Sequence, residues 1–340
     1  MDISVTGPFT IKDNQTDRVI LSGNYLRAVF SKRDNKMYFG QRLLGSNSIT
    51  IKASGENIIW VNNRGYRNTI TINLHKKGLR LINILELEEY IKGIAVREIS
   101  HHWPMEALKA HCVVFRTYAL YRKQESQNKP YDLTTDISTQ SYGGLAAERL
   151  RINEAVAQTK DEILCYQGKI LPAFYSSTCG GATEDAEAVW PKIKCPVLKA
   201  KECPYCKESP HYFWKIILTQ ENLIKAMKKA GIIVKQIKNI QVLSRNQFGR
   251  ALSIRIIYDD SALGISASEL RNLVGQDILK STYFSVTIVD NGFMFKGFGW
   301  GHGVGMCQWG AYAMAKEGFS YRQILDFYYP NSEVKKLNSK

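Results

Sequence analysis

The sequence contains no apolar run that approaches the ~18 residues needed to cross a bilayer, so no membrane-spanning helix is expected within this chain. It also contains no internal repeats and no low-complexity linkers. The opening stretch MDISVTGPFTIKDN lacks the pattern of a signal peptide and begins inside strand-like sequence. Such a beginning is expected of a chain from which a targeting segment has been removed.

Acidic side chains are in deficit. Lys and Arg number 46 against 31 Asp and Glu, which gives a formal net charge of +15. This surplus predicts an anionic partner, either nucleic acid, anionic lipid or an anionic cell-wall polymer. Because the basic residues are dispersed and no arginine-rich arm or nucleic-acid-reading motif is present, nucleic acid is not favoured.

The sequence does have enough apolar residues for a large core, since 44% of its 340 residues are hydrophobic and 11% are aromatic. Alternating runs such as SITIKAS and TITINL predict strands in the N-terminal part. We therefore predict an α+β protein. Its expected parts are a strand-rich N-terminal region (1–80), a core with a helical centre (81–212 with 291–340) and a smaller inserted α+β subdomain (213–290).

Start and stop signals place several elements of the C-terminal half. Thr219 is expected to cap a helix over 220–230, and Ser320 to start another over 321–328. The triplet Asp290-Asn291-Gly292 predicts a hairpin turn, which leads directly into a glycine-rich stretch.

That stretch, GFGWGHGVGMCQWG, has glycine at every second position from 297 to 305. It lacks the Gly-Lys-Ser/Thr ending of a phosphate-binding loop. Alternation with a period of two predicts a strand whose one face is bare backbone, while the other carries Trp300 and His302. A bare face would let a ligand approach the main chain closely, and the structural alternative is a glycine-rich turn or bulge packed on the core.

The segment ELEEYIKGIAVREI predicts a helix with one stripe at i, i+4, i+7 and i+11: Leu87, Ile91, Ile94 and Glu98. Glu98 thus continues an apolar face at a helix end. A carboxylate among apolar neighbours loses solvation, which raises its pKa and suits it to general acid catalysis. The structural alternative is a glutamate turned to solvent or paired with Arg97 or Arg116.

Arg116 follows the apolar run CVVF in the next predicted helix, where Pro104 fits the first helical position. It therefore emerges from a mostly buried face. An arginine in this place could bind a substrate carboxylate or orient Glu98, and the structural alternative is an arginine whose stem covers the core.

Four of the seven cysteines lie in one short region, with Cys203 and Cys206 in C-x-x-C spacing and Cys179 and Cys195 before them. The pattern is typical of a tetrahedral zinc site. In an oxidising compartment the same four cysteines would form two disulfides instead. Either arrangement predicts a structural staple, and a weaker alternative is a Cys179 nucleophile assisted by His302.

Three long blocks resemble the stage II sporulation protein D (SpoIID) and amidase-enhancer family. The first is LELEEYIKGIAVREI followed by WPMEALKAHCVVFRTYAL, the second FYSSTCGGATEDAEAVW, and the third GWGHGVGMCQWGAYAMAKEG with the trailing YRQILDFYYP. They occur in the expected order between about 80 and 330.

The resemblance implies a lytic transglycosylase of peptidoglycan, preferring glycan strands that an amidase has stripped of stem peptides. The family's glutamate ends a G-x-x-x-x-E block that maps onto Gly93 and Glu98. Glu98 would protonate the bond between N-acetylmuramic acid and N-acetylglucosamine and then, as a base, help to form a 1,6-anhydro product. No cofactor is implied for this chemistry. The alternative is a non-catalytic peptidoglycan-binding enhancer of an N-acetylmuramoyl-L-alanine amidase.

Other expectations follow from the same resemblance. The predicted substrate-binding residues are Arg116, Gln140, Tyr142, Ser177, Thr178, Trp300, His302 and Gln308. A Cys/His metal site of some sporulation members is not expected, because the stretch YDLTTDISTQSY contains neither residue type. The implied partners are glycan strands and an amidase, and the implied location is extracytoplasmic.

Overall fold

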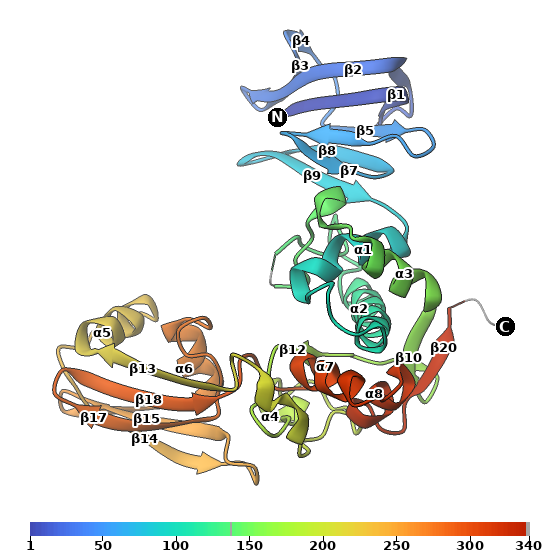
Figure 1. Ribbon diagram of the computed structural model, residues 1–340. Coiled ribbons are helices and arrows are strands. Elements are labelled where there is room, and N and C mark those ends of the chain that lie inside the picture. The colour runs from blue at the N-terminus through green and yellow to red at the C-terminus, as the bar shows by residue number, and fades with distance from the viewer. Residues whose placement is uncertain (137, 338–340) are drawn as a thin grey trace. The chain divides into compact units, whose positions relative to one another are not determined.

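A computed structural model describes residues 1–136 and 138–337 (Figure 1). It confirms the α+β class and the strand-rich N-terminal part. None of the helices in these residues combines the length and the apolarity that a membrane crossing requires.

The chain divides into two compact units. The first is formed by Met1–His102 with Ala119–Asp161, and the second by Trp103–Tyr118 with the chain from Glu162 onwards. The division falls within helix α2 (Met105–Glu125), whose first part belongs to the second unit. The three-part organisation expected from the sequence stays a prediction.

The first unit begins with a sheet in which β1 lies between β2 on one side and β5 and β6 on the other. Its strands are β1 (Asp2–Asp13), β2 (Val19–Arg33), β3 (Lys36–Phe39), β4 (Arg42–Leu43), β5 (Ser48–Ala53), β6 (Ile59–Val61), β7 (Arg64–Tyr66), β8 (Thr69–His75) and β9 (Gly78–Ile84). Neighbouring strands pair antiparallel.

The alternation read from the sequence explains the packing of this sheet. Ile3, Val5, Ile49 and Ile51 are fully buried, and polar residues between them point away from the core. Each such aliphatic side chain stabilises the fold by about 1.5–3 kcal/mol on burial.

Helix α1 (Leu87–Glu98) follows the sheet, and η1 (Gly144–Ala147) and α3 (Leu150–Gln158) complete the unit. The predicted stripe of α1 is confirmed by the complete burial of Ile91 and Ile94. Arg67 joins the sheet to these helices by a two-pronged hydrogen bond to Glu148, with N–O distances of 2.6 and 2.9 Å, and by an ion pair with Glu89 at 3.0 Å.

The second unit alternates short strands and helices. Its elements are β10 (Glu162–Tyr166), β11 (Lys169–Ile170), β12 (Tyr175–Ser176), α4 (Ala186–Val189), η2 (Pro204–Glu208), β13 (Phe213–Thr219), α5 (Gln220–Lys229), β14 (Ile237–Arg245), β15 (Ala251–Tyr258), β16 (Ser261–Ser266), α6 (Ala267–Val274), β17 (Phe284–Val289), β18 (Gly292–Phe298), β19 (Met306–Cys307), α7 (Gln308–Lys316), α8 (Tyr321–Tyr328) and β20 (Glu333–Lys336).

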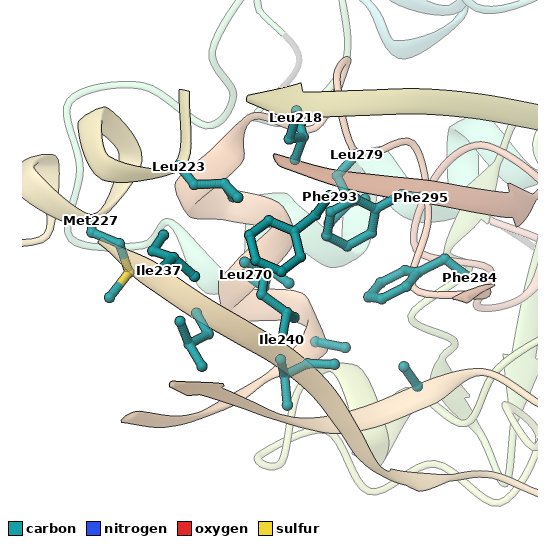
Figure 2. Packing of buried hydrophobic residues seen from close by; sticks show 14 of the residues in the cluster. Leu218, Leu223, Met227, Ile237, Ile240, Leu270, Leu279, Phe284, Phe293 and Phe295 are labelled. Atoms are coloured by element: carbon teal, nitrogen blue, oxygen red, sulfur yellow. The ribbon is translucent and has the colours of Figure 1, made fainter. Parts of the chain in front are cut away.

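The predicted caps and turns of this unit are confirmed. Thr219 and Ser320 each accept a hydrogen bond from the third residue of the helix that they start. The hairpin around Asp290 joins β17 to β18. The strands and helices around this hairpin share a hydrophobic core, in which Phe293 of β18, Leu270 of α6 and Ile240 of β14 point toward one another (Figure 2).

The strand predicted for the whole glycine alternation is wrong beyond Phe298. Strand β18 ends there, and the next four alternate glycines all have positive φ, from 71° to 114°: Gly299, Gly301, Gly303 and Gly305. A strand requires negative φ, whereas glycine alone adopts positive φ without strain. The stretch therefore forms a folded loop with single bridges from Trp300 to Thr178 and from Val304 to Glu184.

Candidate functional site

Glu98 is the last residue of α1 and is half-buried. The backbone N–H of Ser141 donates a hydrogen bond to its Oε1 atom at 3.1 Å. A half-buried carboxyl group held by a backbone amide is a candidate for general acid–base chemistry.

The segment that supplies this N–H is held against α1 by direct packing on Gly93. A Cβ atom at Gly93 would overlap the ring of Tyr142, so only glycine allows the ring to lie there. The Gly143 N–H also donates to the Gly93 carbonyl at 2.9 Å. The G-x-x-x-x-E spacing thus has a structural reason, because Gly93 positions the segment whose amide binds Glu98 one turn further on.

Gln140 and Tyr142 support the same segment. The Tyr90 hydroxyl donates to Gln140 Oε1 at 3.2 Å, and the Tyr142 hydroxyl donates to Asn83 Oδ1 at 2.8 Å. The rings of Tyr90 and Tyr142 stack with centroids 5.6 Å apart. Burial raises the pKa of Tyr142 well above its usual range, so it is a neutral donor. Gln140 has no exposed surface in this structure, so its contact with substrate stays a prediction.

A cavity of about 940 Å³ lies in the same unit, between β9, the start of α1, the end of α2 and the segment 129–136. Tyr90 and Tyr142 are among its lining residues. Arg80, Lys123 and Lys129 also line it, and the Arg80 guanidinium lies 5.6 Å from the centre of the Tyr131 ring. Cations beside aromatic rings can bind an anionic ligand that has an apolar face.

Arg116 belongs to the second unit and is completely buried. Its Nη1 atom donates to the Glu162 carbonyl at 2.8 Å and lies 3.4 Å from the Cys112 carbonyl. Arg116 therefore satisfies backbone acceptors where α2 packs on β10. The prediction that it contacts substrate is corrected, because a fully buried guanidinium offers no surface to a ligand.

Ser177, Thr178 and Gln308 meet where β12 and β19 pair in parallel. Thr178 is fully buried with its Oγ1 2.7 Å from Ser209 Oγ, and Gln308 is buried at the first turn of α7. Thr178 therefore offers no surface to a ligand and Gln308 very little, and their contact with substrate stays a prediction. Ser177 keeps some exposed surface, and its carbonyl accepts from the Trp309 N–H at 3.1 Å.

Trp300 and His302 are both held within the second unit. The Trp300 ring lies 4.4 Å from the His211 ring and 5.0 Å from Lys280 Nζ. His302 Nδ1 accepts a hydrogen bond from the Val304 N–H at 3.0 Å, and its ring lies 4.9 Å from that of Trp190. Burial lowers the pKa of His302 to about 3, so this ring is neutral. The expected proximity of His302 to Glu98 stays a prediction.

The glycines between these residues face the chain itself. A Cβ at Gly299 would overlap the Thr178 carbonyl, one at Gly301 the Ser176 side chain and one at Gly305 the Phe174 carbonyl. The expectation that these glycines open the backbone to a glycan is therefore corrected. They allow the loop to lie directly on the segment 174–179.

Four buried cysteine sulfurs come together in the second unit, all within 4.8 Å of one another: Cys179, Cys203, Cys206 and Cys307. Cys195, predicted as the fourth member, lies outside this group and is only half-buried, in the turn that its carbonyl closes with the Leu198 N–H. Cys307 takes its place because β19 pairs beside Ser176. All seven cysteines lie in the described part of the chain and none of them forms a disulfide there, which corrects the disulfide alternative.

The electrostatics of the group are those of interacting thiols. Burial raises the pKa of the Cys179 and Cys307 thiols well above the usual range. Hydrogen bonding with Cys179 and the other two thiols lowers the pKa of Cys206.

Two residues of the candidate sites, Ser141 and Cys307, are not predicted from the sequence. Ser141 acts through its backbone N–H, for which its side chain gives no signal. Cys307 follows Cys206 by about a hundred residues in the sequence. It lies directly after the glycine-rich stretch and is the N-cap residue of α7.

The first unit carries a glutamate at a helix end, and Gly93, in G-x-x-x-x-E spacing, positions the amide that binds it. Comparison with known proteins identifies the family in which this block occurs. The family model described as Stage II sporulation protein, SpoIID, matches residues 75–166. A second model, described as a domain of unknown function, matches residues 193–305.

Three relatives extend the similarity over most of the chain. An uncharacterized protein of Brachyspira hyodysenteriae is 34% identical over 76% of this chain and 69% of its own length. The amidase enhancer of Bacillus subtilis is 29% identical over 72% of this chain and 40% of its own length. Stage II sporulation protein D of Bacillus amyloliquefaciens is 27% identical over 79% and 80%, respectively. The chain belongs to the SpoIID and amidase-enhancer family.

Proposed function

We propose that this protein is a peptidoglycan lytic transglycosylase that cleaves between N-acetylmuramic acid and N-acetylglucosamine in glycan strands stripped of stem peptides. The observation that carries the proposal is the environment of Glu98: a half-buried carboxyl at the end of α1, bound by the Ser141 N–H within the family's own block.

The proposed chemistry uses this one carboxyl group twice. Glu98 donates its proton to the glycosidic oxygen, and the bond from that oxygen to C1 of the muramic acid breaks. The resulting carboxylate accepts the proton of the 6-hydroxyl as the 6-oxygen bonds to C1. The products are a 1,6-anhydro end and a free 4-hydroxyl, and no water is consumed. A hydrolase would instead need a second carboxyl group or an activated water.

The test is product release from sacculi treated with an amidase, measured by mass spectrometry in water enriched in oxygen-18. The wild-type protein should release 1,6-anhydro products without the heavy isotope, and Glu98→Gln should lower the rate at least 100-fold. Glu154→Gln is the matched control, since Glu154 lies on α3, is exposed and does not line the cavity. Equal rates for wild type and Glu98→Gln would contradict the role of Glu98, and incorporated oxygen-18 would show hydrolysis.

A second candidate function is supported by the similarity to an amidase enhancer. In this case the chain binds the sacculus and accelerates an N-acetylmuramoyl-L-alanine amidase without cutting glycan. The expected result is faster amide cleavage with both wild type and Glu98→Gln, and no anhydro product from either. An extracytoplasmic location belongs to both proposals, because the substrate lies there.

A further inference from the structure

We propose that Cys179, Cys203, Cys206 and Cys307 bind one zinc ion in a closed, structural site of the second unit. The inference concerns the fold of this unit and does not depend on whether the protein cuts glycan.

The geometry of the four sulfurs fits a single tetrahedral ion. Zinc–sulfur bonds of about 2.3 Å place the corners of a tetrahedron about 3.8 Å apart. The four Sγ atoms all lie within 4.8 Å of one another, and Cys179 and Cys206 are 3.5 Å apart. A disulfide would need about 2 Å between two sulfurs, and a cluster of several irons would need the four cysteines further apart.

The surroundings of the sulfurs are those of metal-bound thiolates. The Cys179 N–H donates to Cys307 Sγ at 3.2 Å, and the Gly310 N–H donates to the same sulfur at 3.4 Å. Gly180 makes a backbone hydrogen bond to Cys206, and the Tyr328 hydroxyl lies 3.1 Å from Cys203 Sγ. Such donors orient ligands and reduce the negative charge on sulfur in thiolate sites.

The packing around the group leaves room for the ligands and for little else. A Cβ at Gly310 would overlap the Tyr328 hydroxyl and come within 3.0 Å of Cys203 Sγ, so α7 approaches the group through a glycine. Cys203 and Cys206 are spaced C-x-x-C at the start of η2, the usual spacing of a structural zinc knuckle. With four protein sulfurs as ligands, no coordination position remains for a substrate or water, so the site is structural.

The site would connect three separate segments of the second unit. Cys179 belongs to the segment after β12, Cys203 and Cys206 to the start of η2, and Cys307 to the junction of β19 and α7. The carbonyl of Cys179 also accepts from the buried Arg250 guanidinium, which fixes the first segment from its other side. One ion would therefore hold together the family blocks that contain Ser177 and Trp300.

The first test is metal analysis of the full chain, purified without chelators. We expect one zinc per chain, released in step with the reaction of four thiols when a mercurial reagent is added. Replacement by Co²⁺ should give the intense visible absorption of a tetrahedral tetrathiolate. A metal-free chain whose four thiols alkylate in the native state would overturn the proposal. Bound iron in place of zinc, or two disulfides in the intact mass, would overturn it equally.

Variants assign the ligands. Cys307→Ser should lower the bound zinc to well under half of the wild-type content. Cys195→Ser should leave it unchanged, because Cys195 lies outside the group. Loss of zinc in Cys195→Ser, or full retention of zinc in Cys307→Ser, would contradict the proposed ligands. Either result would favour the four ligands predicted from the sequence, which include Cys195 in place of Cys307. Because the mercurial titration uses wild-type protein, poor folding of Cys307→Ser does not remove the test.

Discussion

Two regions of the molecule both use glycine to allow close packing of segments: the Glu98 region of the first unit, and the region of the second unit formed by the loop 299–305 and the four buried cysteines. They differ in how far their reactive side chains are exposed to solvent. In the first, one glycine, Gly93, lets the Tyr142 ring lie on α1, and the carboxyl group of Glu98 stays partly exposed. In the second, alternate glycines let a loop lie on the segment 174–179, and the sulfur atoms beside it are buried. The first region leaves a carboxyl group available for the proposed proton transfer, and the second holds its own segments together.

The largest expected effect lies in the second region. Gly305→Ala should destabilise the protein by about 3–5 kcal/mol, because Gly305 has φ of 71° and a Cβ would overlap the Phe174 carbonyl. Gly168→Ala is the matched control, since Gly168 has φ of 75° and no atom within 4 Å of its Cβ position. This control should lose only about 1–2 kcal/mol.

Urea unfolding followed by tryptophan fluorescence measures this difference. Five of the six tryptophans lie in the second unit, so the signal reports mainly on that unit. Similar losses in the two variants would show that backbone strain alone, and not close packing, explains the glycine alternation.

The next effect is an acid sensitivity of the second unit. Burial lowers the pKa of His111 to about 4, its Nδ1 atom lies 2.6 Å from the Ala107 carbonyl, and its Nε2 atom is buried without a hydrogen-bond partner among the described residues. In the unfolded chain the same group has a pKa near 6.5. The folded state therefore favours neutral His111, and its stability falls as the pH decreases from 6.5 towards 4.

We expect this group alone to cost about 2–3 kcal/mol of unfolding free energy between pH 7 and pH 4.5. His111→Met should show a smaller loss over the same interval, and His102→Gln, at an exposed position, should behave as wild type. Unfolding midpoints at the two pH values provide the measurement. An unchanged pH dependence in His111→Met would separate this histidine from the acid sensitivity.

The smallest effect on stability, but a sharp one on activity, is expected at Gly93. Gly93→Ala gains about 1 kcal/mol of helix propensity and loses a similar amount by displacing the Tyr142 ring, so stability should change by less than about 1 kcal/mol. The displaced segment moves the Ser141 N–H away from Glu98, so anhydro-product release should fall at least tenfold. Val96→Ala, on the same helix, is the control.

A double variant tests whether the overlap with the Tyr142 ring accounts for the stability that Gly93→Ala loses. Combining Gly93→Ala with Tyr142→Ala removes the overlap, and the double variant should recover stability relative to Tyr142→Ala alone without recovering activity. Full activity of Gly93→Ala would show that the clamp on Glu98 is not required.

Much of the second region could not be predicted from the sequence for a physical reason. Period-two glycine predicts a strand only if φ is negative, and the sign of φ at glycine depends on what packs against it. Likewise, the substrate-binding role predicted for Arg116 depended on exposure, and the carbonyl of Glu162 that binds it lies on another element. Spacing along the chain favoured Cys195, whereas pairing of β12 with β19 brings Cys307 into the group.

The sequence by itself determined the local features. The stripe of Ile91, Ile94 and Glu98, the caps Thr219 and Ser320 and the hairpin at Asp290 follow from interactions within a few residues, and the structure confirms each of them. The tertiary structure alone decided which amide binds Glu98, which glycines adopt positive φ and which cysteine completes the buried group. These depend on contacts between segments distant in the chain, where burial and close approach, and not periodicity, set the arrangement.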